Sequence, residues 1–137
     1  MLPAALRLAA GRAPTLVPVP LTRARLRERG FNQADLLARA LSHRTGWPIE
    51  CLLRRERGGP ALARLGRRER ERVAESAYSV DPKSLPLADP HPQVLIVDDV
   101  ITTGATGVAC GEALGTAGAE CLGIVSFART NPLAEPS

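Results

Sequence analysis

The stretch VLIVDDVITTGATG, residues 94–107, constrains the fold of this chain more than any other part of the sequence. Four aliphatic residues stand directly before two adjacent carboxylates, and a run of threonines and glycines follows. The short, β-branched apolar run predicts a strand buried on both faces, as in parallel sheets, so the charges should begin where the strand leaves the core. Ligands bind at that edge of open α/β sheets, and a turn that opens into a helix presents backbone N–H groups to an anion. The order of residues therefore fits a ligand that carries hydroxyls and a phosphate.

The rest of the sequence alternates between strand and helix patterns. Strands are predicted at 15–19, 48–53, 93–99 and 119–128, the last of them buried, and helices at 3–10, 34–46, 67–76 and 104–118. This alternation indicates an α/β fold with a doubly wound, mostly parallel sheet and right-handed crossovers. The length of 137 residues suits one domain, which we place at 1–130, with residues 131–137 as a disordered tail.

The helix predicted at 34–46 has a marked boundary at each end. Asn32 is well placed as its N-cap, and Gly46 is the residue that should close it. Four apolar side chains are expected to form its buried face: Leu36, Leu37, Ala40 and Leu41.

Composition narrows the class of protein. No apolar run approaches the roughly 20 residues of a membrane helix, and the first residues lack the apolar core of a secretory signal, so we expect a soluble cytoplasmic protein without membrane insertion. The three cysteines, Cys51, Cys110 and Cys121, show no metal-ligand spacing. We expect them to be small buried side chains, neither zinc ligands nor disulfides.

Arginines are concentrated in one segment. Between Arg54 and Arg72 there are eight arginines and three acids, although the net charge of the chain is only +4. Such a run is either a solvated loop and helix face or a surface for an anion, single-stranded DNA included. No aromatic residues interleave with these charges to stack on bases.

Two stretches resemble known families. VLIVDDVITTGAT closely resembles the motif by which type I phosphoribosyltransferases bind 5-phosphoribosyl-1-diphosphate (PRPP). The stretch VPVPLTRARLRERGFNQADLLARAL, residues 17–41, resembles the ComF family, phosphoribosyltransferase-like proteins associated with bacterial competence and DNA uptake. The resemblance implies the type I phosphoribosyltransferase fold, PRPP as ligand and Mg²⁺ as cofactor.

The resemblance also implies a role for each residue of the first motif. Asp98 and Asp99 would be the catalytic pair: they would accept hydrogen bonds from the ribose 2- and 3-hydroxyls and orient waters on the magnesium ion. Backbone N–H groups and hydroxyls, helped by the helix dipole, would hold the 5-phosphate. The residues of this phosphate cradle would be Thr102, Thr103, Gly104, Ala105 and Thr106.

By the same resemblance, the loop after the first strand, residues 20–33, would bind the diphosphate. Arginine suits this task because its guanidinium makes paired hydrogen bonds to phosphate oxygens. For Asn32 and Gln33, helix capping and ligand contact are equally open. The segment 54–72 falls where type I enzymes carry a flexible hood over the substrate. The candidate diphosphate contacts are Thr22, Arg23, Arg25 and Arg29.

The implied reaction transfers phosphoribose from PRPP to an unidentified amine or nucleobase. Loss of diphosphate builds charge that Mg²⁺ and arginines would stabilise, and no protein nucleophile is required. Turnover is open, because a PRPP-sensing module that binds single-stranded DNA or competence proteins fits the same residues. A receiver-like phospho-acceptor domain fits less well. Such a domain carries an acid pair after its first strand and a lysine after its last, whereas the acid pair of this chain follows a late strand and its one lysine is Lys83.

Two features remain open at this point. ComF-like proteins usually begin with a cysteine-rich zinc-binding segment, whereas this chain starts within the core domain, so it is a short form or its start lies upstream. The oligomeric state is open as well, and a dimer is plausible.

Overall fold

The computed structural model describes residues 1–55, 66, 68, 77–81, 84 and 92–130. Several predicted features lie outside these residues: all but Arg68 of the helix at 67–76, most of the proposed hood, and the tail at 131–137.

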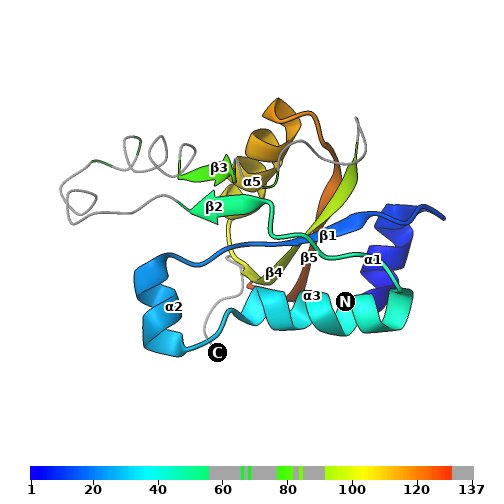
Figure 1. Cartoon of the computed structure of the whole chain (residues 1–137), viewed down its shortest axis with the longest axis horizontal. Coiled ribbons are helices and arrows are strands. Elements are labelled where there is room, and N and C mark those ends of the chain that lie inside the picture. The colour runs from blue at the N-terminus through cyan, green and yellow to red at the C-terminus, as the bar shows by residue number, and fades with distance from the viewer. Residues whose placement is uncertain (56–65, 67, 69–76, 82–83, 85–91, 131–137) are drawn as a thin grey trace.

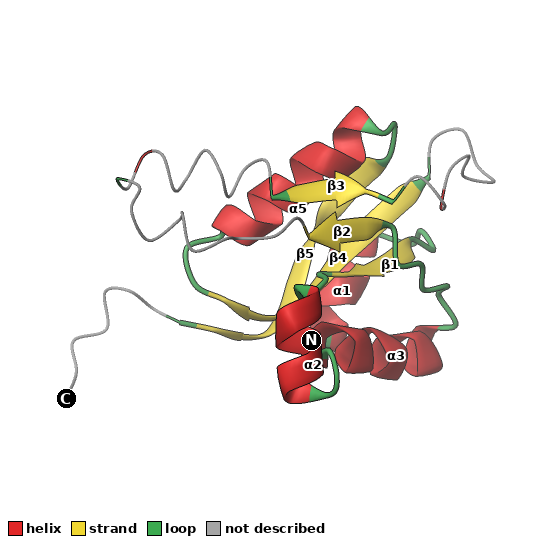
Figure 2. Cartoon of the chain, turned by 60° about the vertical axis from the view of Figure 1, so that its left-hand side comes forward, coloured by secondary structure: helices red, strands yellow, loops and turns green. Residues whose placement is uncertain are grey.

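Four helices and five strands make up the described fold (Figure 1). In chain order they are α1 (Leu2–Ala9), β1 (Thr15–Pro18), α2 (Arg23–Arg29), α3 (Gln33–Thr45), β2 (Leu53–Arg55), β3 (Tyr78–Val80), β4 (Gln93–Ile101), α5 (Ala105–Thr116) and β5 (Glu120–Arg129). Strands β1, β4 and β5 form a parallel sheet in the order β1-β4-β5, and β2 and β3 form a separate antiparallel pair (Figure 2). The predicted α/β class is confirmed.

The central strand β4 separates two apolar cores. Successive side chains of a strand point to opposite faces. Val94 and Ile96 accordingly pack in the cluster that includes α5, whereas Leu95 and Val97 pack in the cluster that includes α1 and α3. Figure 1 shows α5 above the sheet and α3 below it. All four side chains are at most 1% exposed, so the aliphatic run is buried on both faces, as predicted.

The strand predicted at 48–53 is confirmed only in part. Ile49 forms one parallel bridge with Leu16 of β1, after which the chain leaves the sheet. Strand β2 begins at Leu53 and pairs with β3 instead. Leu52 and Leu53 are buried in the cluster with α5, so burial of this pair draws the chain away from the sheet edge. The prediction of a strand over the whole segment is therefore wrong.

Helix α3 has the predicted ends but a different buried face. The Asn32 side chain accepts a hydrogen bond from the Ala34 N–H, and Gly46 closes the helix with φ 77°. The buried residues are Ala34, Ala38 and Leu41, whereas Leu36 and Ala40 are exposed and Leu37 is partly buried. The two alanines let the helix lie close to the sheet, and this contact decides the buried face.

Strand β5 was predicted to be buried, but Val125 is its one buried residue. It stands at the edge of the described sheet, with β4 on one side only, which leaves most of its side chains half-buried or exposed. The prediction of three buried cysteines holds for Cys110 on α5 and is wrong for Cys121 on β5 and for Cys51, which are exposed.

Within the part of the chain that the structure describes, no helix combines the length and the apolar character needed to cross a membrane.

Candidate functional site

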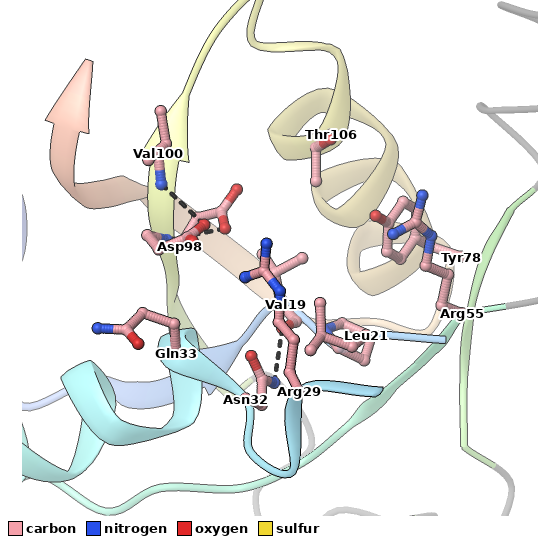
Figure 3. Close-up of a pocket in the computed structure, with 12 residues that line it drawn as sticks. Val19, Leu21, Arg29, Asn32, Gln33, Arg55, Tyr78, Asp98, Val100 and Thr106 are labelled. Carbon is pink, nitrogen blue, oxygen red and sulfur yellow. Dashed lines mark hydrogen bonds between the residues drawn. The ribbon is translucent and has the colours of Figure 1, made fainter. Parts of the chain in front are cut away.

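The carboxyl ends of β1 and β4 meet at one edge of the sheet. Pro18 pairs with Val97, and the Val19 N–H donates a hydrogen bond to the Val97 carbonyl oxygen at 2.9 Å. The chain after β1 therefore runs beside the acid pair of β4, and a pocket of about 180 Å³ opens between them (Figure 3). Its lining residues are Val19, Pro20, Leu21, Arg29, Asn32, Gln33, Arg55, Tyr78, Asp98, Asp99, Val100 and Thr106.

The acid pair lies where burial ends but not where the strand ends. Val97 is fully buried and Asp98 and Asp99 are half-buried, yet β4 continues to Ile101 and still pairs with β5. Asp98 Oδ1 accepts from the Asp99 N–H at 2.8 Å, and Asp99 Oδ1 accepts from the Val100 N–H at 2.9 Å. An ionised carboxylate can accept about four hydrogen bonds, so both groups keep acceptor capacity for a ligand.

The pKa of Asp98 is raised to about 6, chiefly by burial and also by the neighbouring Asp99 carboxylate. The hydrogen bond from the Asp99 backbone and the charge of Arg55 act in the opposite direction. A half-buried carboxyl with a raised pKa binds a cation or a hydroxyl donor in its ionised form, because either one compensates the lost hydration. The acid pair is thus chemically suited to a metal ion or a diol.

The threonine-glycine turn leads into α5. Gly104 is the N-cap residue of this helix with φ 85°, a left-handed conformation that glycine adopts without a steric penalty. The Thr103 hydroxyl oxygen accepts from the Ala105 N–H at 3.3 Å, while Thr102 and Thr103 are both exposed. Of the five residues predicted to cradle a phosphate, the structure places Thr106 alone in the pocket wall.

The segment predicted to be a diphosphate-binding loop contains a helix, α2, that the prediction missed. Thr22 caps it by accepting from the Arg25 N–H at 3.2 Å, and Gly30 closes it with φ 80°. A threonine followed eight residues later by a glycine was the signal for this helix. Of the four predicted contacts in this segment, Arg29 lines the pocket, whereas Thr22, Arg23 and Arg25 do not.

Asn32 joins two elements of the pocket. Its Nδ2 donates to the Val19 carbonyl oxygen at 3.0 Å, and its Oδ1 accepts from the Ala34 N–H at 3.1 Å (Figure 3). The side chain thereby attaches the beginning of α3 to the end of β1. Capping, one of the two roles left open for this residue, is confirmed, and both Asn32 and Gln33 also line the pocket.

Two lining residues, Arg55 of β2 and Tyr78 of β3, were not among the predicted site residues, although Arg55 belongs to the segment 54–72 that the resemblance placed over the substrate. The Arg55 guanidinium carbon lies 5.7 Å from the centre of the Tyr78 ring. Burial raises the pKa of the Tyr78 hydroxyl, while the charge of Arg55 and a hydrogen bond with Thr106 lower it. The pair is 23 positions apart in sequence, so no local pattern could identify it.

The chain is similar to curated proteins named for DNA utilization and competence. It is 35% identical over 117 residues to DNA utilization protein YhgH of Salmonella typhi and of Escherichia coli K12, covering 84% of this chain and 49% of each relative. It is 32% identical over 115 residues to Competence protein F of Haemophilus influenzae, covering 83% of this chain and 49% of the relative. The chain thus spans about half the length of the curated relatives it matches.

No family model matches the chain. A crystal structure of TT1426 from Thermus thermophilus aligns with 98% of this chain and 82% of that protein, at 18% identity and a TM-score of 0.40. A likeness at that score carries no argument about the fold.

Proposed function

We propose that this chain is a ComF-type domain with the type I phosphoribosyltransferase fold, which binds PRPP with Mg²⁺ and serves DNA utilization or competence. One observation carries the proposal: Asp98 and Asp99 line a pocket together with Arg29 and Thr106, at the carboxyl ends of two parallel strands. The similarity to proteins named for DNA utilization and competence supports the proposed cellular role.

The pocket offers suitable partners for each part of PRPP. The free acceptor capacity of Asp98 and Asp99 suits the ribose 2- and 3-hydroxyls. The beginning of α5, where Gly104 has no side chain to cap the helix and Thr103 accepts from the Ala105 N–H, offers the following backbone N–H groups to the 5-phosphate. Arg29 would contact the diphosphate, because a guanidinium binds phosphate oxygens in pairs.

The acid pair also fits a magnesium ion. Mg²⁺ prefers oxygen ligands, keeps several waters, and is held by one or two carboxylates together with substrate phosphates. Among the described residues, no three His, Cys, Asp or Glu side chains gather to form a metal site on their own. Asp98 and Asp99 would therefore hold the ion jointly with water and the diphosphate, and the ion would supply charge stabilisation to the leaving group.

If the domain turns over, its residues act by position and charge. Departure of diphosphate leaves positive charge on the ribose ring, which the two carboxylates would stabilise, and negative charge on the leaving group, which Arg29 would stabilise. Besides hydroxyls, the described pocket lining contains the carboxylates of Asp98 and Asp99 as potential nucleophiles, but the proposed transfer requires no protein nucleophile. Pyrophosphate release from PRPP in the presence of single amines and nucleobases would identify the acceptor.

Thermal unfolding tests the ligand. Mg²⁺ with PRPP should raise the melting temperature by mass action, and ribose 5-phosphate should raise it less. The double variant D98N/D99N should lose the PRPP shift while remaining folded. The matched control is D35N/E50Q, which also removes two negative charges but away from the pocket lining. Absence of any shift at millimolar PRPP in the unmodified chain would overturn the proposal.

Helix α2 favours a second candidate function, the binding of single-stranded DNA. It carries four arginines and one glutamate in seven residues, and none of its residues is buried. None of these arginines forms an ion pair with an acid in the described part of the chain. Neutralised phosphates release counterions, so such binding must weaken steeply with salt.

Filter binding at several salt concentrations tests this second function. The variant R23A/R25A/R27A, which leaves Arg29 in the pocket, should lower DNA affinity, flatten its salt dependence and leave PRPP binding unchanged. If the unmodified chain binds no DNA at low salt, the candidate is rejected and the PRPP-binding function is unaffected.

A further inference from the structure

The antiparallel pair β2–β3 brings an arginine and a tyrosine to the same pocket. Arg55 and Tyr78 are direct cross-strand partners in the register of this pair. Side chains directly opposite each other in an antiparallel pair have Cβ atoms about 4.5–5.5 Å apart. This register explains why the guanidinium lies over the ring at 5.7 Å, and both side chains line the pocket.

The adjacent arginine has different contacts. Side chains alternate along a strand, so Arg54 and Arg55 point to opposite faces of the pair. Arg54 forms an ion pair with Asp81 at 3.5 Å and is not among the lining residues. The pleat thus separates two neighbouring arginines into one that faces the pocket and one that does not.

Tyr78 is a firm support for Arg55. It is 8% exposed and packs in the core cluster that includes α5. A guanidinium held on a buried aromatic ring loses less conformational freedom when it binds an anion, since its plane is already oriented.

The pocket contains two cations on separate segments, Arg29 at the end of α2 and Arg55 at the end of β2. Neither forms an ion pair with an acid in the described residues, so both guanidinium groups can bind a ligand anion. In the view of Figure 3, the carboxylate of Asp98 lies on one side of the pocket and Arg55 lies against Tyr78 on the other.

We propose that Arg55, supported by Tyr78, binds the diphosphate group of the ligand together with Arg29. This inference rests on the proposed PRPP function and adds to it a binding residue and a positioning residue that the sequence did not reveal. Arg55 is a binding residue because it contacts the ligand. Tyr78 is a positioning residue, because it acts through Arg55.

Titration calorimetry with Mg²⁺ and three probes, PRPP, inorganic pyrophosphate and ribose 5-phosphate, tests the assignment. The variant R55A should weaken PRPP and pyrophosphate about tenfold or more, the usual effect of losing a charge-assisted hydrogen bond. Ribose 5-phosphate should be unaffected, because it lacks the diphosphate. The variant R55K, which keeps the charge without the paired donors, should fall between R55A and the unmodified chain.

The matched control is R54A, which removes an equal charge one position earlier. It should change each affinity less than about threefold, because solvent screens an exposed charge outside the pocket. For the positioning role, Y78F keeps the ring face and should keep diphosphate affinity. The variant Y78L keeps an apolar side chain in the core but loses the ring, so it should weaken diphosphate binding. A thermal scan of Y78L checks that the variant is still folded.

Each outcome decides between the two proposals. If PRPP binds and R55A behaves like R54A, the assignment of Arg55 is wrong and the PRPP function remains. If pyrophosphate binds in an Arg55-dependent manner but PRPP does not, the diphosphate site remains and the PRPP function is wrong. If neither probe binds the unmodified chain, both are overturned.

Discussion

The segment that follows β1 and the last residues of β4 lie side by side at one edge of the sheet, yet they use their polar groups differently. After β1, Thr22 caps α2, and Asn32 caps α3 while also bonding to the Val19 carbonyl. Near the end of β4, Asp98 and Asp99 accept only from the next residue's N–H among the described hydrogen bonds. The first segment stabilises the scaffold with its side chains, and the second keeps acceptors available for a ligand.

This difference separates stability from binding. A side chain already bonded within the protein affects folding when it is removed, because its partners lose a hydrogen bond. A side chain with spare acceptor capacity affects folding little and ligand affinity strongly. Substitutions in the first segment should therefore change the free energy of unfolding, and substitutions in the second should change the affinity for the ligand.

The largest stability effect is expected at Asn32. The variant N32A removes an N-cap and a part-buried bond to Val19, each typically about 1 kcal/mol, so the free energy of unfolding should fall by about 2 kcal/mol. Serine can cap but cannot reach Val19, so N32S should lose about half of that amount. Urea denaturation measures both. Equal losses in the two variants would show that the cap contributes nothing, and an N32S variant as stable as the unmodified chain would show the same of the bond to Val19.

Two glycines sharpen the comparison. Gly104 and Gly30 have φ of 85° and 80°, and a Cβ atom at either would meet nothing within 4 Å. Each change to alanine should therefore cost about 1 kcal/mol from backbone conformation alone. The variant G104A should also weaken PRPP binding, whereas G30A should not. Equal effects of both variants on PRPP affinity would contradict the division between scaffold and ligand segments.

The substitution D98N should stabilise the protein, with a defined pH dependence. The pKa of Asp98 is about 6 in the folded chain against an ordinary value of 3.8, so folding favours the protonated form. The stability that this form provides is complete below pH 3.8 and is lost as the pH rises through 6. The melting temperature of D98N should thus equal that of the unmodified chain at about pH 3.5 and exceed it by a few degrees at about pH 8. If the two melting temperatures differed by the same amount at every pH in this range, the raised pKa of Asp98 would not be the cause of the stabilisation.

The smallest effect is expected at Thr22. Its hydrogen bond to the Arg25 N–H is exposed, and it caps a helix of seven residues with no buried side chain. The variant T22A should therefore lower the free energy of unfolding by about 0.5 kcal/mol, the low end for a lost cap. A loss as large as that of N32A would mean that α2 contributes more to the scaffold than its exposure indicates.

The sequence by itself determined the elements whose signals are local. The aliphatic run of β4, the cap at Asn32 and the glycine that closes α3 were all readable, because a strand run or a cap depends on residues a few positions apart. The same is true of the acid pair, which lies where the buried run ends. Helix α2 had a local signal as well, in Thr22 and Gly30, and was missed.

Only the tertiary structure decided which residues meet across long separations in the chain. The exposure of β5 follows from its place at the sheet edge, and the buried face of α3 follows from close packing of Ala34 and Ala38. The pairing of Arg55 with Tyr78 depends on β2 leaving the parallel sheet for β3. Burial and strand pairing are interactions between distant segments, and no spacing within a single segment carries that information.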